Sequence, residues 1–167
     1  MAGSNVEGIA SPFDGLAISC DLACEFFAVF SRFEFALKEC GFVYVNREGR
    51  AVPDWRGYRD RAATLLRIQD DAVLVEAVAY LNDEPPQVQV GAQSWSDTSA
   101  LRGTAPAGTA LDATQRVRNN LFHGGKHSPH SPPGRDEKLV RAGLAVLYAC
   151  LTQDDNLRRE YEQPTVY

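Results

Sequence analysis

The strongest hydrophobic pattern in the chain lies between positions 21 and 39. Four large apolar residues recur there at intervals of three or four: Phe26, Phe30, Phe33 and Leu37. This spacing places them on one side of an α-helix and predicts a helix from Asp21 to Glu39 with a buried stripe. Gly41 is typical of a helix C-terminal end. Phe35 projects from the opposite side of this helix, so we expect a second face to be covered as well.

Two further helices are predicted in the first half of the chain. Pro53 and Asp54 form a start signal for a helix that carries Trp55, Tyr58, Ala62, Leu65 and Leu66. The next helix runs from about Asp71 to Leu81 and ends before Pro85-Pro86. Residues 85–108 are rich in Pro, Gly, Ser and Thr, which predicts a long loop with at most one brief strand near Val88.

The second half of the chain predicts two more helices. Thr109 and Asp112 have the spacing of a capping box and place the start of a helix near Thr109. Residues 127–134 contain three prolines and a glycine, which favour a loop. A last helix is expected from about Arg135 to Glu162. Five helices with little strand signal predict a single all-α helical bundle over residues 1–167, and this length allows a core without metals or disulfides.

The residues with the clearest chemical potential lie at the end of the fourth predicted helix. The run from Arg116 to Lys126 contains Arg118, Asn119, Asn120 and His123, and Gly124-Gly125 follows. A guanidinium is always charged and matches phosphate oxygens, whereas an imidazole transfers protons near neutral pH. On a continuous helix, side chains at i and i+5 point about 140° apart. Fraying or kinking of the helix after Asn120 would let both groups address one phosphate.

In this segment, Arg118 is followed by the polar Asn119 and then by His123 at a helix end, which resembles the signature of the HEPN superfamily. A second resemblance to the same family, of the defence and toxin type, lies in the first predicted helix, and the two stretches cover about residues 24–42 and 112–126. The resemblance implies the same fold as the residue pattern, a HEPN-like helical bundle. The pattern itself gives about five helices and the long loop between the third helix and the motif helix. The resemblance also implies a metal-independent endoribonuclease that works as a homodimer in a toxin or defence system.

The resemblance assigns roles to the residues of the motif. His123 is expected to transfer protons and Arg118 to neutralise charge on the phosphate, while Asn119 orients one or the other. Asn120, Lys126 and Arg116 are candidate binding residues, and Lys126 in particular is a candidate phosphate contact. Glu34 is expected either to hold Arg118 in place or to form an exposed ion pair with Lys38, and the sequence leaves both open.

Composition and charge limit the partners. The net charge is −5, which argues against a general nucleic-acid coat protein. Six basic residues face only two acidic ones between Gln115 and Arg141, however, and such a confined basic patch suits a small phosphate-bearing target, here RNA. The N-terminus lacks the features of a signal peptide and no stretch is apolar enough to span a bilayer, so a cytoplasmic location without membrane contact is expected.

No cofactor is expected. The spacing of Cys20 and Cys24, like that of His123, His127 and His130, fits no common metal site, and the cysteines are expected to be reduced thiols.

Alternatives remain open at this point. Arg118 and His123 together have a purely structural reading, as a packed arginine and a helix-capping histidine. The whole chain also has a non-catalytic reading, as a HEPN helical module that binds RNA, nucleotide or a protein partner. A partner antitoxin or defence protein is compatible with the family, but many HEPN domains carry a modified Tyr where this chain has Gly125. That departure weakens the case for regulation of this kind.

Overall fold

The computed structural model describes residues 9, 11, 13–92, 94–96, 100–122 and 132–163. The α-helices in these residues are α1 (Cys20–Glu39), α2 (Trp55–Leu65), α3 (Ala72–Asp83), α4 (Pro106–Phe122), α5 (Arg135–Gln153) and α6 (Asp155–Glu162), with a short 3-10 helix at Ile68–Asp70. Two antiparallel hairpins pair β1 (Val43–Val45) with β2 (Ala51–Pro53) and β3 (Val88–Gly91) with β4 (Ser94–Ser96). The predicted all-α helical bundle is confirmed.

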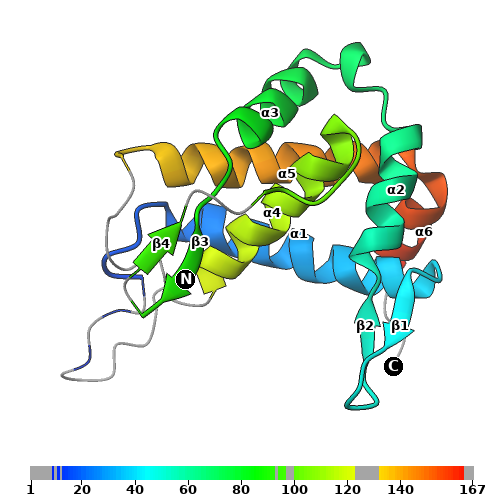
Figure 1. Ribbon diagram of the computed structural model, residues 1–167, viewed down its shortest axis with the longest axis horizontal. Coiled ribbons are helices and arrows are strands. Elements are labelled where there is room, and N and C mark those ends of the chain that lie inside the picture. The colour runs from blue at the N-terminus through cyan, green and yellow to red at the C-terminus, as the bar shows by residue number, and fades with distance from the viewer. Residues whose placement is uncertain are drawn as a thin grey trace.

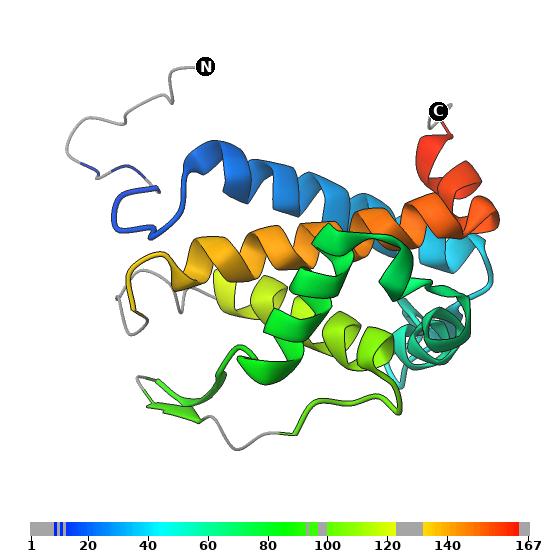
Figure 2. The ribbon, with the colours of Figure 1, turned by 90° about the horizontal axis from the view of Figure 1, so that it is seen from above.

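The bundle is arranged around its long helices. α1 and α5 lie side by side and run in the same direction, and α4 packs against α5 (Figures 1 and 2). α3 crosses α4 and α5, α2 packs on α4, and α6 folds back onto α1. The two hairpins lie near opposite ends of the bundle (Figure 1). No helix in the part of the chain that the structure describes is long and apolar enough to cross a bilayer.

The apolar stripe of α1 forms the centre of the core, as its spacing predicts. Phe26, Phe33 and Leu37 are completely buried and Phe30 is nearly so. α5 approaches this stripe closely at Gly143, where a β-carbon would lie 3.3 Å from the Phe26 ring and 3.2 Å from a methyl group of Thr114. Gly143 is therefore required by close packing of α5 against both α1 and α4.

The predicted start of the motif helix was wrong by one turn. α4 begins at Pro106, so Thr109 and Asp112 lie inside the helix rather than at its cap. Proline is favoured at the first helical position because its missing N–H has no intrahelical partner there. The Thr109 hydroxyl donates to the carbonyls of Ala105 and Pro106, and Asp112 forms buried ion pairs. The capping-box spacing arose from residues with other roles.

The predicted last helix is in fact two helices. Asp154 breaks it: its backbone leaves the helical region, and its side chain accepts a hydrogen bond from the N–H of Leu157 at the start of α6. Asp and Asn favour such cap positions, and Asp154-Asp155-Asn156 carried this signal in the sequence. The break lets α6 turn back toward α1, where Arg32 of α1 donates to the carbonyls of Tyr161 and Gln163.

The hairpins are the other difference from the sequence prediction. The long segment after α3 contains a two-stranded hairpin, β3 and β4, where at most one strand was expected. The β1–β2 hairpin between α1 and α2 was not predicted, because three-residue strands are too short to show a clear alternation. Its strands are joined by a turn in which the Asn46 side chain accepts from the N–H groups of Glu48 and Arg50.

Candidate functional site

The candidate site lies at the C-terminal end of α4, which carries the first part of the motif. Val117 is buried on the core side of this helix, whereas Arg118 is half-buried and Asn119 exposed. Arg118 therefore lies at the border between core and solvent. This is the position predicted from its place next to Val117, because residues one apart lie 100° apart on a helix.

Two aromatic rings hold the guanidinium of Arg118. Its Cζ atom lies 5.5 Å from the centroid of Phe30 on α1 and 5.8 Å from that of Phe122, one turn further along α4. Both distances are within the range of a cation–π contact, which attracts the cation without removing its charge. Among the described residues, no carboxylate forms an ion pair with Arg118. The two rings thus hold the guanidinium in place, and no carboxylate of the described residues neutralises its charge.

The two asparagines after Arg118 have different surroundings. Asn119 is exposed, and its side-chain oxygen accepts a hydrogen bond from Arg118 Nη1 at 3.2 Å. Asn120 is buried and its amide donates to the backbone carbonyl of Gln87 at 2.8 Å. Asn119 is therefore placed to orient the guanidinium. Asn120 instead fastens α4 to the segment that leads into β3.

Arg116 lies on another side of α4 and is engaged in a buried ionic network. Its Nη2 atom is 3.1 Å from a carboxylate oxygen of Asp112, and it also donates to the carbonyl of Ala100. Arg59 of α2 binds the other oxygen of Asp112 at 3.2 Å, and the N–H of Arg102 completes the network at 3.0 Å. The structure thus does not bring Arg116 together with Arg118. It links α2, α4 and the loop before α4.

Glu34 supports Arg118 through two aromatic rings. Its carboxylate accepts a hydrogen bond from the indole N–H of Trp55 at 3.0 Å, and among the described residues it forms an ion pair with neither Arg118 nor Lys38. Trp55 stacks on Phe30 with ring centroids 5.3 Å apart, and Phe30 in turn contacts Arg118. Neither sequence alternative for Glu34 describes this arrangement.

Three aromatic residues near Arg118 were not singled out from the sequence as part of a site. Phe30 was assigned only to the core, and Phe27 and Phe122 were not considered. Phe122 had a detectable signal, because residues at i and i+4 on a helix are neighbours. The position of Phe27 depends on how α1 and α4 pack, and this packing cannot be read from spacing.

His123 and Lys126 lie outside the described residues, as do His127 and His130. The structure therefore describes the site up to Phe122 only. In that part of the chain, no group of three or more His, Cys, Asp or Glu side chains is suited to a metal ion.

The exposed thiols of Cys20 and Cys24 lie 3.9 Å apart at the start of α1. Desolvation, followed by the hydrogen bond and charge of Cys24, raises the pKa of Cys20, which disfavours the thiolate form that a metal needs.

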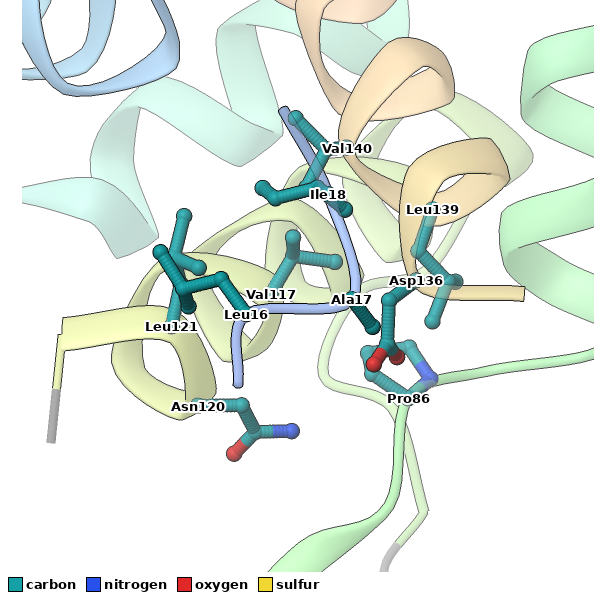
Figure 3. A pocket seen from close by; sticks show the side chains of 10 residues that line it. All are labelled: Leu16, Ala17, Ile18, Pro86, Val117, Asn120, Leu121, Asp136, Leu139 and Val140. Atoms are coloured by element: carbon teal, nitrogen blue, oxygen red, sulfur yellow. The ribbon is translucent and has the colours of Figure 1, made fainter. Parts of the chain in front are cut away.

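A small cavity lies behind the motif helix. It is about 10 Å³ in volume and is enclosed by residues 16–18, α4, α5 and Pro86 (Figure 3). Asn120 and Asp136 are its polar members and both are buried. A space of this size holds about one water molecule, so it is too small for a nucleotide. The residues around it bring the segment before α1 together with the C-terminal end of α4 and the N-terminal end of α5.

Comparison of the chain with protein-family models, with characterised proteins and with solved structures finds no match. The class that the fold itself defines is a single-chain helical bundle.

Proposed function

We propose that this protein is a metal-independent endoribonuclease of the HEPN type. The observation that carries the proposal is the state of Arg118: a guanidinium held at a solvent-facing helix end by two aromatic rings, with its charge not neutralised by any described carboxylate. An anion is the natural ligand for such a group, and a phosphate offers the oxygen pairs that match it. His123 follows one residue after the end of α4 in the sequence.

The proposed reaction uses the RNA itself as the nucleophile. The ribose 2′-oxygen attacks the adjacent phosphorus, a proton leaves the 2′-hydroxyl, and the bond from phosphorus to the 5′-oxygen breaks as that oxygen gains a proton. The products are a 2′,3′-cyclic phosphate and a 5′-hydroxyl. His123 serves as the proton carrier for one of these transfers, and Arg118 stabilises the charge that grows on the non-bridging oxygens.

The other residues of the motif have supporting roles in this proposal. Asn119 holds the guanidinium from its exposed side through the 3.2 Å hydrogen bond. Lys126 contacts a phosphate of the substrate. Arg116 is part of the buried network with Asp112, so its proposed contribution is to hold the motif helix in place rather than to bind RNA.

The proposed working species is a homodimer in which two His123 side chains face a shared cleft. A single motif supplies one proton carrier, whereas cleavage gains from both an acid and a base. Phe35, 42% exposed on the outer side of α1, is an apolar surface residue of the kind that pairing would cover. The proposed setting is a toxin or defence system, with an RNA substrate and a cytoplasmic location.

The experiment that tests the proposal is cleavage of total RNA by the pure protein. The wild type is expected to release fragments with 2′,3′-cyclic phosphate ends, and His123→Ala is expected to release none while keeping the helical circular dichroism of the wild type. Unchanged cleavage by His123→Ala would refute the assignment. Binding of RNA without cleavage by the wild type would instead favour the non-catalytic module.

A second test concerns metals. Cleavage is expected to persist at the same rate in EDTA, because the nucleophile is the 2′-hydroxyl and no metal-bound water takes part in the proposed reaction. The measurement compares initial rates before chelation, after it, and after Mg²⁺ or Mn²⁺ is added back. Loss of activity on chelation and its recovery with a divalent ion would contradict this mechanism.

A further inference from the structure

An exposed pair of aromatic rings lies next to Arg118. Phe27 on α1 is 56% exposed and Phe122 at the end of α4 is 40% exposed. Their ring centroids are 5.3 Å apart with an interplanar angle of 63°, so the two rings meet edge to face. Phe26, Phe30 and Phe33 of α1 are buried, whereas Phe27 is more than half exposed.

The rings have a fixed place beside a positive charge. Phe122 contacts both Phe27 and the guanidinium of Arg118, which lies between Phe122 and the buried Phe30. Three side chains from two helices thus hold one another at the surface. Aromatic side chains that are exposed but held in place offer flat apolar faces at a low entropic cost to a ligand.

The cation of Arg118 suits the phosphate of a nucleotide, and the two aromatic rings suit its base. Proteins that bind single-stranded nucleic acid combine cations for the backbone with aromatic rings on which bases stack. Here the Cζ atom of Arg118 and the Phe122 centroid are 5.8 Å apart, so a phosphate at Arg118 and a base on the adjacent rings are within the span of neighbouring parts of one strand. A base inside a duplex has both faces covered by its neighbours and is not available for such stacking.

We infer that Phe27 and Phe122 form a platform that stacks an unpaired nucleobase of the RNA whose phosphate is bound by Arg118. The nature of the ligand rests on the proposed ribonuclease function. The platform adds what the motif does not contain: a contact to a base, made by one residue of α1 and one of α4. It selects for unpaired RNA and contributes to the choice of cleavage position.

The experiment measures binding without cleavage, so that it stays separate from catalysis. The probe is a fluorescein-labelled pentanucleotide of 2′-O-methyl RNA, which lacks the attacking hydroxyl, and a matched probe carries an abasic central position. Fluorescence anisotropy gives the dissociation constant of each. The wild type is expected to bind the complete probe about tenfold more tightly than the abasic one, since stacking of one base on an aromatic ring gives an effect of this order.

Phe27→Leu is the main variant because Phe27 does not contact the Arg118 guanidinium and is more than half exposed. It is expected to abolish the tenfold difference, and Phe27→Tyr, which keeps a ring, is expected to restore most of it. Tyr44→Leu is the matched control, since Tyr44 is a 55% exposed aromatic residue on β1, away from the end of α4 (Figure 1). It is expected to retain the full difference.

Several outcomes would overturn the platform. One is a Phe27→Leu variant that still binds the complete probe about tenfold more tightly. Another is a wild type that does not distinguish the two probes. A third is a Phe27→Leu variant that changes the mass in light scattering but not the binding of the probe, which would assign this surface to a second copy of the chain.

The two proposals fail in different ways. Base-dependent binding by a wild type that never cleaves RNA would refute the nuclease and leave the platform. If the wild type cleaves RNA and Phe27→Leu binds both probes as the wild type does, the platform is refuted and the nuclease remains.

Discussion

Two arginines, two residues apart on the same helix, are used in opposite ways. The guanidinium of Arg116 lies against the carboxylate of Asp112 in a largely buried network that also contains Arg59. The guanidinium of Arg118, about 200° further round α4, lies between the rings of Phe30 and Phe122. A carboxylate fixes an arginine by neutralising it, whereas an aromatic ring fixes it and leaves its charge for a ligand. The first region stabilises the fold, and the second has the features of a binding site.

The largest expected effect comes from breaking the first region. Asp112→Asn removes the negative charge that pairs with the buried Arg59 and with Arg116. Removing one partner of a buried ion pair costs about 3–5 kcal/mol because an uncompensated charge remains. We expect the free energy of unfolding to fall by this amount in urea denaturation. A loss below about 1 kcal/mol would mean that the network does not hold α2 and α4 together.

A third arginine, Arg61, pairs with Asp154, and this pair makes the stability of the protein depend on pH. Burial alone would raise the pKa of Asp154, but the hydrogen bonds from Arg61 at 2.6 and 3.1 Å and those from backbone N–H groups outweigh it and lower the pKa. The stability from this carboxylate is therefore present above its ordinary pKa of about 3.9 and is lost as the pH falls below that value.

Asp154→Asn keeps a residue that caps α6 and removes the charge. We expect a loss of about 1–2 kcal/mol at pH 7, because the Arg61 side chain is 40% exposed and screened by solvent. The difference between variant and wild type in the free energy of unfolding, measured by urea denaturation, should shrink as the pH falls below about 4. A difference that is constant with pH would show that the charge of Asp154 does not contribute.

A smaller effect is expected at Glu34, which supports Arg118 indirectly through Trp55 and Phe30. Glu34→Ala leaves the buried indole N–H of Trp55 without its acceptor, at a cost of about 1–2 kcal/mol, whereas Glu34→Gln keeps an acceptor and should cost less than about 1 kcal/mol. Since Trp55 stacks on Phe30, RNA cleavage by Glu34→Ala should fall several-fold at saturating RNA, with Glu34→Gln near the wild type. Equal cleavage rates for both variants and the wild type would mean that Glu34 does not contribute to the site.

The sequence predicted the regular part of this fold well. The apolar stripe of α1 and the start of α2 at Asp54 follow from local spacing and local capping, and both are confirmed. The predicted start of α4 was wrong and the break at Asp154 was missed, because residues that form caps also occur in ion pairs and inside helices. Asp112 shows this directly: its spacing from Thr109 imitates a cap, while its carboxylate binds two arginines from different parts of the chain.

The candidate site was predictable to the same extent. The position of Arg118 at the border of the buried face follows from helical geometry and agrees with the structure. Part of what distinguishes Arg118 from Arg116 is local, since Phe122 and Asp112 are their respective i, i+4 neighbours on α4. The other contacts come from outside the helix: Phe30 of α1 for Arg118 and the carbonyl of Ala100 for Arg116. These depend on how the elements pack, and no spacing within α4 contains that information.

The most direct test of the account is the rate of RNA cleavage by Arg118→Ala. Each aromatic contact of the guanidinium is worth about 0.5–1 kcal/mol at an exposed site, so the free energy of unfolding should fall by no more than about 2 kcal/mol. Loss of a group that stabilises the developing charge should lower the cleavage rate at least about 100-fold. A variant that cleaves RNA at the wild-type rate, or one that no longer folds, would contradict the claim that Arg118 is held in place for a phosphate.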